Sequence, residues 1–480
     1  MDRSALSATL SAKLSADLIA KLPLLPTIAR LAADRGERVW LVGGLVRDAL
    51  LGRASLDADI TVDGDAMALA KAVADEAGAR FVALHDAEPT ARVVLDGVEY
   101  DLAQWRREDL SGDLRARDLT INAMAMPLTV DGLGEVVDPT GGLADLRDRR
   151  VRACSREALA DDPLRTMRVY RFFAELDFSI DEDTRAWVRA TAPGLADVAG
   201  ERVLVEWTKT LATSRAASAL RLMAEDGVLA LVAPELAGSP HAPDVATPEW
   251  LDAVAWFDAW SERLEKITPE AARERIANDA VLGDVAMMKT AAALAPATDG
   301  DAAAYEEVAD RLKASAKFKQ RGARTIRLMD EARSAAAEWR ELVDEMRCKT
   351  PMAEDRRRLV AQYSATTGEY ALAAAVLIWA CEAVRGGDPP RRLDETHSGW
   401  IAYLASMLVG AVEPYAANPI LDGETLMREC GVPPGPQVGR LLAVVREEYL
   451  AGCIDSPSQA LAMVRGILDR ESGSPSTSSH

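Results

Sequence analysis

Short apolar runs separated by glycine and polar turns occupy the first hundred residues, and they predict a sheet with helices between its strands. Val39 to Val42 is a run typical of a buried strand, and Gly43-Gly44 predicts the turn that ends it. Val46 to Leu51 has the length and spacing of a short helix. Leu56 to Val62 alternates polar and apolar residues and predicts the next strand.

The same pattern continues through residue 102. Asp65 to Ala77 has the apolar spacing of a helix, and Asp96-Gly97 is a hairpin turn signal. The predicted strands, of which the last two run antiparallel, are Phe81–Leu84, Ala91–Leu95 and Val98–Leu102.

Beyond residue 150 the chain is alanine-rich, with helical spacing. The longest apolar run, Ala371 to Cys381, is shorter than the roughly 18–20 residues of a membrane span and predicts a buried helix. Arg385 to Pro390 predicts a linker, and Glu471 to His480 predicts a disordered end. Leucines at four-residue spacing predict an N-terminal amphipathic helix and not a signal peptide: Leu6, Leu10, Leu14, Leu18 and Leu22.

Length and composition narrow the class of protein. A chain of 480 residues is long enough for more than one domain. Its five cysteines include no Cys-x-x-Cys pair, which suits a reducing cytoplasm and gives no zinc site. A net charge of −20 is unusual for a nucleic-acid binder, since phosphate contacts dominate such affinity. The segment from Arg147 to Arg171, however, contains eight arginines and only four acidic residues, and we interpret it as a contact surface for nucleic acid.

Asp57 and Asp59 are the first candidates for chemistry. Side chains alternate along a strand, so the two carboxylates are expected on one face. They repel each other unless a cation lies between them, and divalent ions that carry a nucleoside triphosphate are a good candidate. Taken alone, an Asp-x-Asp pair more often belongs to a solvated strand edge. The Gly43-Gly44 turn favours the functional interpretation, because glycine lets backbone approach phosphate closely.

Leu41 to Asp59 resembles the first motif of the DNA polymerase β nucleotidyltransferase superfamily, and more narrowly that of class II CCA-adding enzymes and bacterial poly(A) polymerases. That motif is Leu-Val-Gly-Gly-x-Val-Arg-Asp-x-Leu-Leu-Gly followed by Asp-x-Asp, and each of its elements is present. The resemblance implies an α+β fold, in which a polymerase β-like head with a mixed sheet and helices precedes an all-α neck, body and tail. The implied domains are an N-terminal amphipathic helix (1–30), the nucleotidyltransferase head (31–150), the neck that selects the nucleobase (151–220), the body (221–390), the tail (400–470) and a disordered end (471–480).

The resemblance also assigns roles to residues of the head. Asp57 and Asp59 are implied ligands of two Mg²⁺ ions, and Asp101 is implied as the third catalytic carboxylate, on a neighbouring strand. The residues implied to frame the triphosphate are Gly43, Gly44, Arg47 and Asp48.

Asp113 to Ala125 resembles the family's second motif, Arg-Arg-Asp-Phe-Thr-x-Asn-Ala, which holds the sugar. Arg117, Asp118 and Asn122 are expected to do so here, because carboxylate and amide oxygens accept from ribose hydroxyls and arginine neutralises phosphate. The chain departs from the motif at Ala116 and Leu119, and Ala116 receives no role. The alternative is a helix in which the aspartate and asparagine only satisfy local backbone groups.

Val137 to Leu146 matches a third stretch of the family, Asp-Pro-x-Gly-Gly-x-x-Asp-Leu. Asp-Pro and Gly-Gly require a tight turn, so we predict that this stretch is architectural.

Asp161 to Phe172 resembles the family's Glu-Asp-x-x-Arg motif and the helix beyond it. Asp162 and Arg165, three residues apart, are expected on one side of a helix, where an acceptor and a donor complement the edges of cytosine and adenine. Guanine and uracil would place a carbonyl oxygen against the carboxylate. The alternative is that Asp162 caps the helix and forms an ordinary surface ion pair.

Further residues of this motif complete the implied nucleotide site. Asp161 stands where glutamate is usual, which puts its support of the arginine in doubt, and two later arginines are expected to reach phosphates. The nucleotide-binding set in this segment is Asp161, Asp162, Arg165, Arg168 and Arg171.

These motifs imply template-independent addition of C or A, from CTP or ATP with Mg²⁺, to the 3′ end of tRNA or another RNA, in the cytoplasm and without a membrane. Only Arg106 to Gly112 separate Trp105 from the second motif, where relatives usually have a longer flexible loop and CC-adding enzymes look shortened. We therefore prefer CC addition, followed by a separate A-adding enzyme, over full CCA addition. The alternatives are a poly(A) polymerase and a non-catalytic RNA-binding relative, and retention of both strand aspartates disfavours the second.

Overall fold

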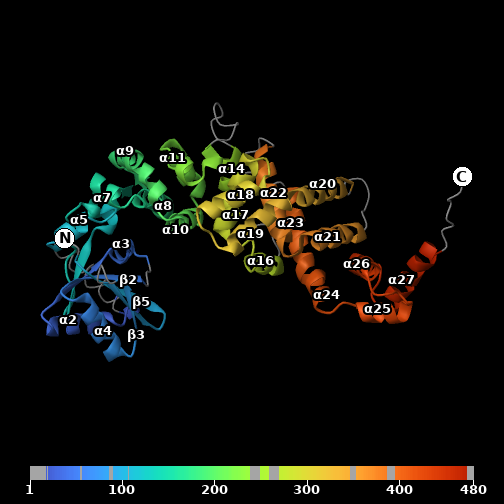
Figure 1. The fold of residues 1–480 in the computed structure, drawn as a ribbon, viewed down its shortest axis with the longest axis horizontal. Coiled ribbons are helices and arrows are strands. Elements are labelled where there is room, and N and C mark those ends of the chain that lie inside the picture. Colours follow the sequence, from blue (N-terminus) through green and yellow to red (C-terminus); the bar gives the residue numbers. More distant parts are fainter. Residues whose placement is uncertain are drawn as a thin grey trace, which may run out of the picture. The chain divides into compact units, whose positions relative to one another are not determined.

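The computed structural model describes residues 18, 20–53, 57–85, 90–105, 107–237, 249–258, 270–345, 353–385 and 395–472. Most of the predicted N-terminal amphipathic helix and most of the predicted linker after Arg385 lie outside these residues. The chain forms two compact units, which Figure 1 shows as ribbons. One contains residues 1–206 and 225–231, and the other contains residues 207–224 and 232–480.

A mixed seven-stranded sheet forms the centre of the first unit, in the order β3-β4-β5-β2-β1-β6-β7. Neighbouring strands are antiparallel except β2 and β5, which are parallel. The strands are β1 (Arg38–Val42), β2 (Asp57–Asp63), β3 (Arg80–His85), β4 (Thr90–Leu95), β5 (Val98–Gln104), β6 (Ala125–Thr129) and β7 (Gly132–Leu133). The helices that accompany them are α2 (Leu25–Asp34), α3 (Gly44–Leu50), α4 (Ala66–Ala77), α5 (Leu110–Arg115) and α6 (Gly142–Arg147).

The predicted strands from Val39 to Leu102 and the hairpin between β4 and β5 are confirmed. Asp96 and Gly97 both have positive φ (50° and 81°), as a two-residue hairpin turn requires. The pair β6 and β7 was not predicted. β6 contains Pro127, which argues against a strand inside a sheet, yet it lies between β1 and β7.

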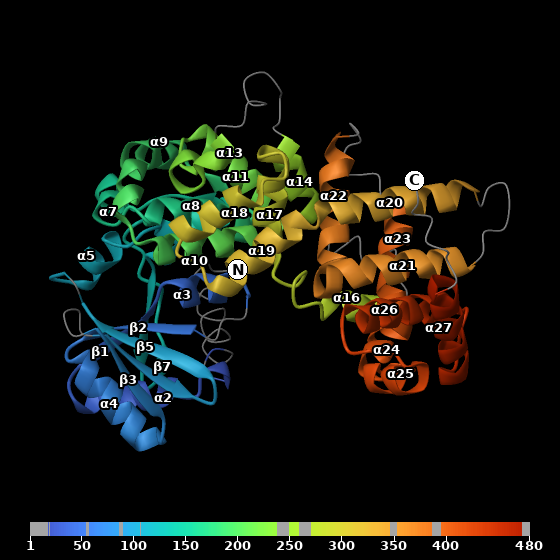
Figure 2. The same ribbon diagram turned by 45° about the vertical axis from the view of Figure 1, so that its right-hand side comes forward.

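The two faces of the sheet differ in character. Ala58, Ile60 and Tyr100 are buried on the face that α2 and α4 cover (Figure 2). The Tyr100 hydroxyl accepts a hydrogen bond from the backbone N–H of Leu24, 3.3 Å away, which fixes the start of α2. The opposite face, with the alternate residues of β2 and β5, therefore remains available for polar side chains.

The chain then continues as short helices. β8 (Arg150–Val151) and β9 (Ser179–Ile180) form a separate parallel pair beside them. The helices are α7 (Arg156–Asp161), α8 (Arg165–Leu176), α9 (Glu182–Thr191), α10 (Gly200–Leu211), α11 (Ala216–Glu225), α12 (Leu229–Val232) and α13 (Pro234–Ala237).

The rest of the second unit, among the described residues, consists of helices joined by turns and contains no strand. The predicted buried helix is confirmed in α22, whose residues Ala371 to Cys381 are all buried. The larger helices are α14 (Glu249–Asp258), α16 (Glu270–Ala277), α17 (Val285–Ala297), α18 (Ala302–Arg311), α19 (Ala316–Arg327), α20 (Met329–Glu345), α21 (Ala353–Thr367), α22 (Ala371–Arg385) and α23 (Glu395–Met407).

One helical stretch among the described residues, Trp400–Ala417, is long and apolar enough to cross a membrane, although a core helix passes the same test. Trp400, Ile401 and Leu404 in it are buried inside the protein.

The last helices, α24 (Glu413–Ala417), α25 (Gly423–Cys430), α26 (Pro436–Ala451) and α27 (Pro457–Ser472), include a small core of their own around Leu426 and Val445. The expectation of disorder from Glu471 onward needs correction at its start. Glu471 lies in α27 and accepts two hydrogen bonds from Arg440, at 2.7 and 2.9 Å.

The Asp-Pro-x-Gly-Gly stretch is architectural, as predicted. One carboxylate oxygen of Asp138 accepts from the backbone N–H groups of Gly141 and Gly142, both at 2.8 Å, and the other accepts from that of Leu143, at 2.9 Å. A Cβ at Gly142 would lie 2.2 Å from the carbonyl oxygen of Thr120, so the turn packs directly against backbone.

We predict that Gly142→Ala destabilises the first unit by about 2–4 kcal/mol, since neither backbone segment can move away cheaply. Urea unfolding followed by circular dichroism measures this. Gly439→Ala is the control: a Cβ at Gly439, in α26, would have no atom within 4 Å, so this change should stabilise slightly. Equal effects of the two substitutions would contradict the packing argument.

Candidate nucleotide-binding site

Asp57 and Asp59 lie on the open face of the sheet, as the alternation predicted. Both side chains are exposed, whereas Ala58 and Ile60 between and beside them are buried. The parallel register places Asp59 opposite Asp101 and Asp57 opposite Glu99, so four carboxylates share this face.

The glycine turn lies directly against this acidic face. A Cβ at Gly43 would be 3.1 Å from Oδ2 of Asp59 and 3.3 Å from Nη1 of Arg117. Gly43 also has φ of 72°, a conformation that other residues rarely adopt. The backbone of the turn, a carboxylate and a guanidinium thus meet at one place, as a site for a metal-bound phosphate requires.

The surroundings of Asp59 disfavour the charged form of its carboxyl group. Burial among surrounding protein atoms raises the pKa of Asp59, Arg117 opposes that shift, and the charges of Asp101 and Asp57 add to it. Asp59 still contacts solvent, so the cleft is crowded but open. A divalent cation would relieve this repulsion, and paired carboxylate oxygens are ligands that Mg²⁺ accepts.

Asp101 is not free in this structure. Arg92 donates to both of its oxygens, from Nε at 2.7 Å and from Nη2 at 2.8 Å, and also forms an ion pair with Glu99. No group of three or more acidic, histidine or cysteine residues that could hold a metal ion occurs in the part of the chain described. A metal contact by Asp101 would therefore require Arg92 to move.

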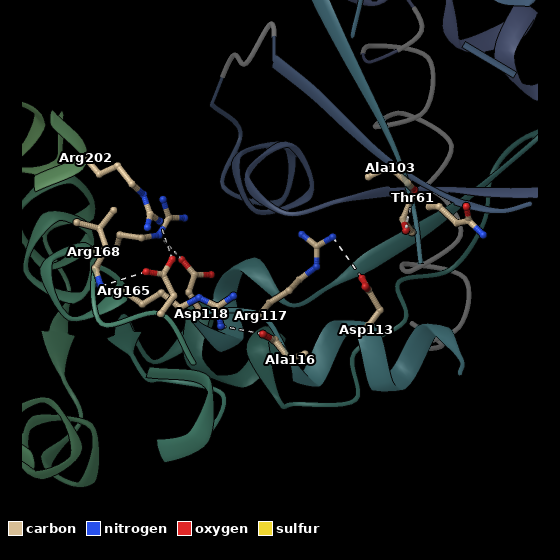
Figure 3. Close-up of a pocket in the computed structure, with 12 residues that line it drawn as sticks. Thr61, Ala103, Asp113, Ala116, Arg117, Asp118, Arg165, Arg168 and Arg202 are labelled. Atoms are coloured by element: carbon tan, nitrogen blue, oxygen red, sulfur yellow. Dashed lines mark hydrogen bonds and ion pairs between the residues drawn. The ribbon is translucent and has the colours of Figure 1, made fainter. Parts of the chain in front are cut away.

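A cavity of about 310 Å³ opens beside the acidic face, entirely within the first unit. Figure 3 shows Arg165, Arg168 and Arg202 gathered around Asp118 at one end of it, and Thr61 and Ala103 at the other. Its lining is Thr61, Ala103, Gln104, Asp113, Ala116, Arg117, Asp118, Asp162, Leu164, Arg165, Arg168 and Arg202. It thus unites residues from the second and the Glu-Asp-x-x-Arg motifs.

Asp118 is the buried centre of this cavity wall. Its carboxylate accepts from Nε of Arg168 at 2.7 Å, and its side chain is 8 % exposed. Burial alone would raise the pKa of Asp118, but the charge and hydrogen bond of Arg168 outweigh it, so the pKa is lowered. Asp118 is thereby held as an anion at the cavity.

Asn122 connects Asp118 to the first motif. Its amide nitrogen lies 3.4 Å from each Asp118 oxygen, and its amide oxygen accepts from Arg47 at 2.6 Å. The asparagine lies in a short turn, Thr120–Asn122, and both it and Asp118 bond to side chains far away in sequence. The alternative of a helix that only satisfies its own backbone is therefore wrong.

Arg47 points into the protein and not toward a ligand. It is 5 % exposed, donates to both oxygens of Asp48 at 2.9 and 2.8 Å, and lies over the ring of Phe172. Gly44 packs beside its guanidinium, which would lie 3.5 Å from a Cβ at that position. Of the residues expected to frame the triphosphate, Gly43 is the one that reaches the acidic face.

Asp162 and Arg165 both line the cavity but do not share a helix, which corrects that expectation. α7 ends at Asp161 and α8 begins at Arg165. Oδ1 of Asp162 accepts from the backbone of Leu164 at 3.2 Å, and Oδ2 accepts from Arg202 at 2.9 Å. Of the alternative interpretation, the cap is absent, because Leu164 occupies the N-cap position of α8 without a side-chain bond, whereas a surface ion pair of Asp162 is present but joins it to Arg202 and not to Arg165.

Two backbone carbonyl groups hold the guanidinium of Arg165 in place. Its Nη1 donates to the carbonyl oxygens of Ala116 and Ala158, both at 2.8 Å. Ala116, where the family motif has arginine, thus contributes a carbonyl group. The rest of the guanidinium is left for a ligand in the cavity.

Arg171 and Asp161 are placed differently from expectation. Arg171 is buried and bonds to Glu206 at 3.1 Å, so the expected phosphate contact would require that pair to break. Asp161 does not support Arg165, because it is exposed and lies 3.9 Å from Arg107. Of the two arginines expected to reach phosphates, Arg168 lines the cavity and Arg171 does not.

Arg202 and Glu206 also belong to this site, although the motifs did not predict them. Arg202 holds Asp162, and Glu206 bonds to both Arg168 and Arg171 from α10. Their four-residue spacing on one helix was a usable signal, since it places an acid and a base on the same face.

Most arginines of the Arg147–Arg171 segment have partners within the unit, although three of them, Arg147, Arg149 and Arg150, keep exposed side chains (75%, 61% and 42%), so its role as a contact surface stays a prediction. Seven of its eight arginines bond to acidic side chains or backbone carbonyls: Arg147 and Arg150 to Asp148, Arg149 to Asp177, Arg152 to Asp145, Arg165 to Ala116, Arg168 to Asp118 and Arg171 to Glu206.

Comparison with known proteins agrees with this geometry. Residues 39–152 match the family described as the poly A polymerase head domain, and residues 177–239 match the "Probable RNA and SrmB- binding site of polymerase A". A CC-adding tRNA nucleotidyltransferase of Geobacter sulfurreducens is 46% identical over 191 residues, 39% of this chain and 44% of that protein. A CCA-adding enzyme of Geobacillus thermodenitrificans is 34% identical over 263 residues, 49% of this chain and 60% of the relative. The chain thus spans about half the length of these relatives.

Solved structures resemble the whole fold. A CCA-adding enzyme in complex with CTP has a TM-score of 0.68 and 23% identity, with 96% of this chain and 98% of that chain covered. A Thermotoga maritima CCA-adding enzyme complexed with tRNA has a TM-score of 0.67 at 23% identity, with 95% and 98% covered. At such identity the likeness concerns the fold.

The mixed sheet with its carboxylate face, followed by a helical remainder, defines a nucleotidyltransferase fold of the polymerase β type. Within that class, the chain is similar to class II CCA-adding enzymes and bacterial poly(A) polymerases: the poly A polymerase head domain matches residues 39–152, and tRNA nucleotidyltransferases that add CC or CCA are 46% and 34% identical over part of the chain. Nucleotidyltransferases of this superfamily generally use a divalent metal.

We predict that Arg168→Gln reverses the pH dependence that Asp118 gives to stability. In the native protein the lowered pKa of Asp118 stabilises the fold above the unfolded value of about 3.9, and this contribution is lost as pH falls through the folded pKa. Without Arg168, burial raises the pKa instead, so the variant should lose roughly 3–5 kcal/mol near neutral pH and recover part of it near pH ~3.

Urea unfolding at several pH values measures this difference. Arg202→Gln is the control, because its pair with Asp162 is more exposed (54% and 29%) and should matter little at any pH. A constant deficit of Arg168→Gln from acid to neutral pH would contradict the role assigned to Asp118.

Proposed function

We propose that this chain adds C residues to the 3′ end of tRNA from CTP, as a CC-adding nucleotidyltransferase of the cytoplasm. The observation that carries the proposal is the adjacency of Gly43, Asp59 and Arg117 to the cavity that Arg117, Asp162 and Arg165 line. A triphosphate on the acidic face would thus place its nucleoside against the residues suited to recognise a base.

In the proposed reaction the RNA 3′-oxygen forms a bond to the α-phosphorus of CTP, the bond from that phosphorus to the β-phosphate bridge breaks, and pyrophosphate leaves. The hydroxyl proton passes to solvent. Two Mg²⁺ ions, held by Asp57 and Asp59, would supply charge neutralisation and a lowered pKa of the attacking hydroxyl when bound. Arg117 adds a positive charge beside Asp59, and the Gly43 backbone allows phosphate to approach.

The sugar and base would be held by the cavity wall. Asp118, kept anionic by Arg168, can accept from ribose hydroxyls, and Asn122 maintains its position. Asp162 has lone pairs beyond those used by Leu164 and Arg202 and can accept from the cytosine amino group. Arg165 can donate to the ring nitrogen and carbonyl oxygen of cytosine.

The preference for CC addition rests on the short segment before the second motif. α5 begins at Leu110, so Arg106 to Asp109 are all that separate it from Trp105. Two relatives, at 46% and 42% identity, are both CC-adding enzymes, which supports the same choice. Full CCA addition, with ATP as second substrate, is the alternative, since a CCA-adding relative is 34% identical.

The direct test is incubation of tRNA that lacks its CCA end with magnesium and each labelled triphosphate separately, and then with labelled ATP and unlabelled CTP together. We predict incorporation of two C residues and no subsequent A. Asp59→Asn should reduce incorporation at least about 1,000-fold, because a metal-holding carboxylate is lost. The control is Asp63→Asn on the same strand. The Asp63 carboxylate accepts a hydrogen bond from Nε of Arg38 at 2.8 Å, and Asp63 does not line the cavity.

Addition of A after CC would replace the CC-adding proposal with CCA addition. Full activity of Asp59→Asn would contradict the assignment of the site, and absence of any incorporation by the native protein would favour a non-catalytic RNA-binding relative.

We further predict that Asp162→Ala lowers discrimination of CTP against UTP by roughly 10- to 100-fold, since the acceptor for the amino group is removed. Competition between the two labelled triphosphates measures this ratio. Glu157→Ala, on the exposed side of α7, should leave it unchanged. An unaltered ratio in Asp162→Ala would show that base choice lies elsewhere.

A further inference from the structure

The segment from Arg311 to Met329 contains seven basic residues and no acidic one, in a chain whose net charge is −20. Lysine is scarce in the sequence, with ten in 480 residues, and three of those ten lie between Lys313 and Lys319. Most of this segment is helix α19, in the second unit and remote in sequence from the nucleotide cavity (Figures 1 and 2).

α19 is firmly packed on one side. Gly322, Ala323 and Ile326 are buried, and Thr325 beside them is fully buried. A Cβ at Gly322 would lie 2.0 Å from Cζ of Tyr305 in α18, so the glycine is required for this close contact. α19 is therefore a rigid support for the side chains on its opposite, exposed face.

The outer face is polar and cationic. Lys317, Gln320, Arg324 and Arg327 are exposed at spacings of three and four residues, which places them in one row along the helix. Lys313 is exposed in the turn just before α19.

Several of the cations already have partners. Lys319 bonds to Asp310 at 2.6 Å, Arg327 pairs with Glu306, and Arg321 donates to the carbonyl oxygen of Ala280 at 2.7 Å. By contrast, no ion pair links Lys313, Lys317 or Arg324 to any residue within the described ranges. These three positive charges are exposed and uncompensated, unlike those of the Arg147–Arg171 segment.

We infer that this outer face of α19, with Lys313, is a contact surface for the phosphate backbone of the RNA substrate. The inference rests on the proposed function. Lys317 and Arg324 are seven residues apart, about 10 Å along a helix, which equals roughly three base-pair rises along the axis of a duplex. Lysine suits such contacts as a flexible point charge, and the row offers no apolar or aromatic group for base recognition.

The charge balance favours RNA as the occupant. A chain of net negative charge repels polyanions, so exposed and uncompensated cations such as these favour the approach of a phosphate backbone at their own position. The surface would hold the RNA body without regard to its sequence, while the cavity chooses the nucleotide.

The test is the affinity of the full chain for tRNA lacking its CCA end, measured by fluorescence anisotropy at several salt concentrations. Lys317→Gln combined with Arg324→Gln should weaken binding about fivefold at ~0.1 M salt and reduce the slope of log K against log salt by about two. The KM for CTP at saturating tRNA should not change, because neither residue lines the cavity.

The matched control is Lys319→Gln combined with Arg327→Gln, which removes two cations of the same helix that already have acidic partners. It should change affinity and salt slope much less. Native affinity and slope in the Lys317/Arg324 variant would overturn this inference and leave the proposed function intact. A native protein that neither binds tRNA nor incorporates nucleotide would overturn both.

Discussion

Arg168 holds together the part of the molecule on which the proposed chemistry depends. It extends from α8 to Asp118, in the second motif of the head, and to Glu206 of α10. Removal of one partner from a buried ion pair typically costs several kcal/mol, because the remaining charge stays in a medium of low polarity. The pairs therefore fix the helical wall of the cavity relative to the sheet that carries Asp57 and Asp59.

The same network gives each charged group a single position. Asn122 connects Asp118 to Arg47, and Arg47 in turn holds Asp48 and packs over Phe172. Residues that the family motifs suggested as ligand contacts thus divide into two sets. Asp59, Arg117, Asp118, Asp162 and Arg165 are placed where a ligand can meet them, while Arg47 and Arg171 maintain the geometry from inside.

Local patterns in the sequence predicted what local physics determines. The two-residue turn at Asp96-Gly97 needs positive φ, so the hairpin could be predicted, and alternation along β2 placed Asp57 and Asp59 on one face. The tight turn after Asp138 followed from its Asp-Pro and Gly-Gly pairs, whereas the role of the Asp138 carboxylate as acceptor for its N–H groups was seen only in the structure.

What the sequence could not supply was the choice of partners between distant segments. Nothing near Asp162 indicates that Arg202, 40 residues later, would pair with its charge, or that α8 would begin only at Arg165. Eight arginines counted along a segment likewise suggested a surface, yet folding pairs most of them. The number of basic residues in a segment predicts attraction of a polyanion only where the folded protein leaves their charges without acidic partners, as at Lys317 and Arg324.

A double-mutant cycle between Asp118 and Arg168 tests this account most directly. Free energies of unfolding and CTP affinities would be measured for Asp118→Asn, Arg168→Gln, the combined variant and the native chain. We predict a coupling energy of about 2 kcal/mol or more in unfolding, together with CTP affinity lost in each single variant. Additive effects on stability, with a coupling below about 0.5 kcal/mol, would contradict the claim that this partly buried pair fixes the site.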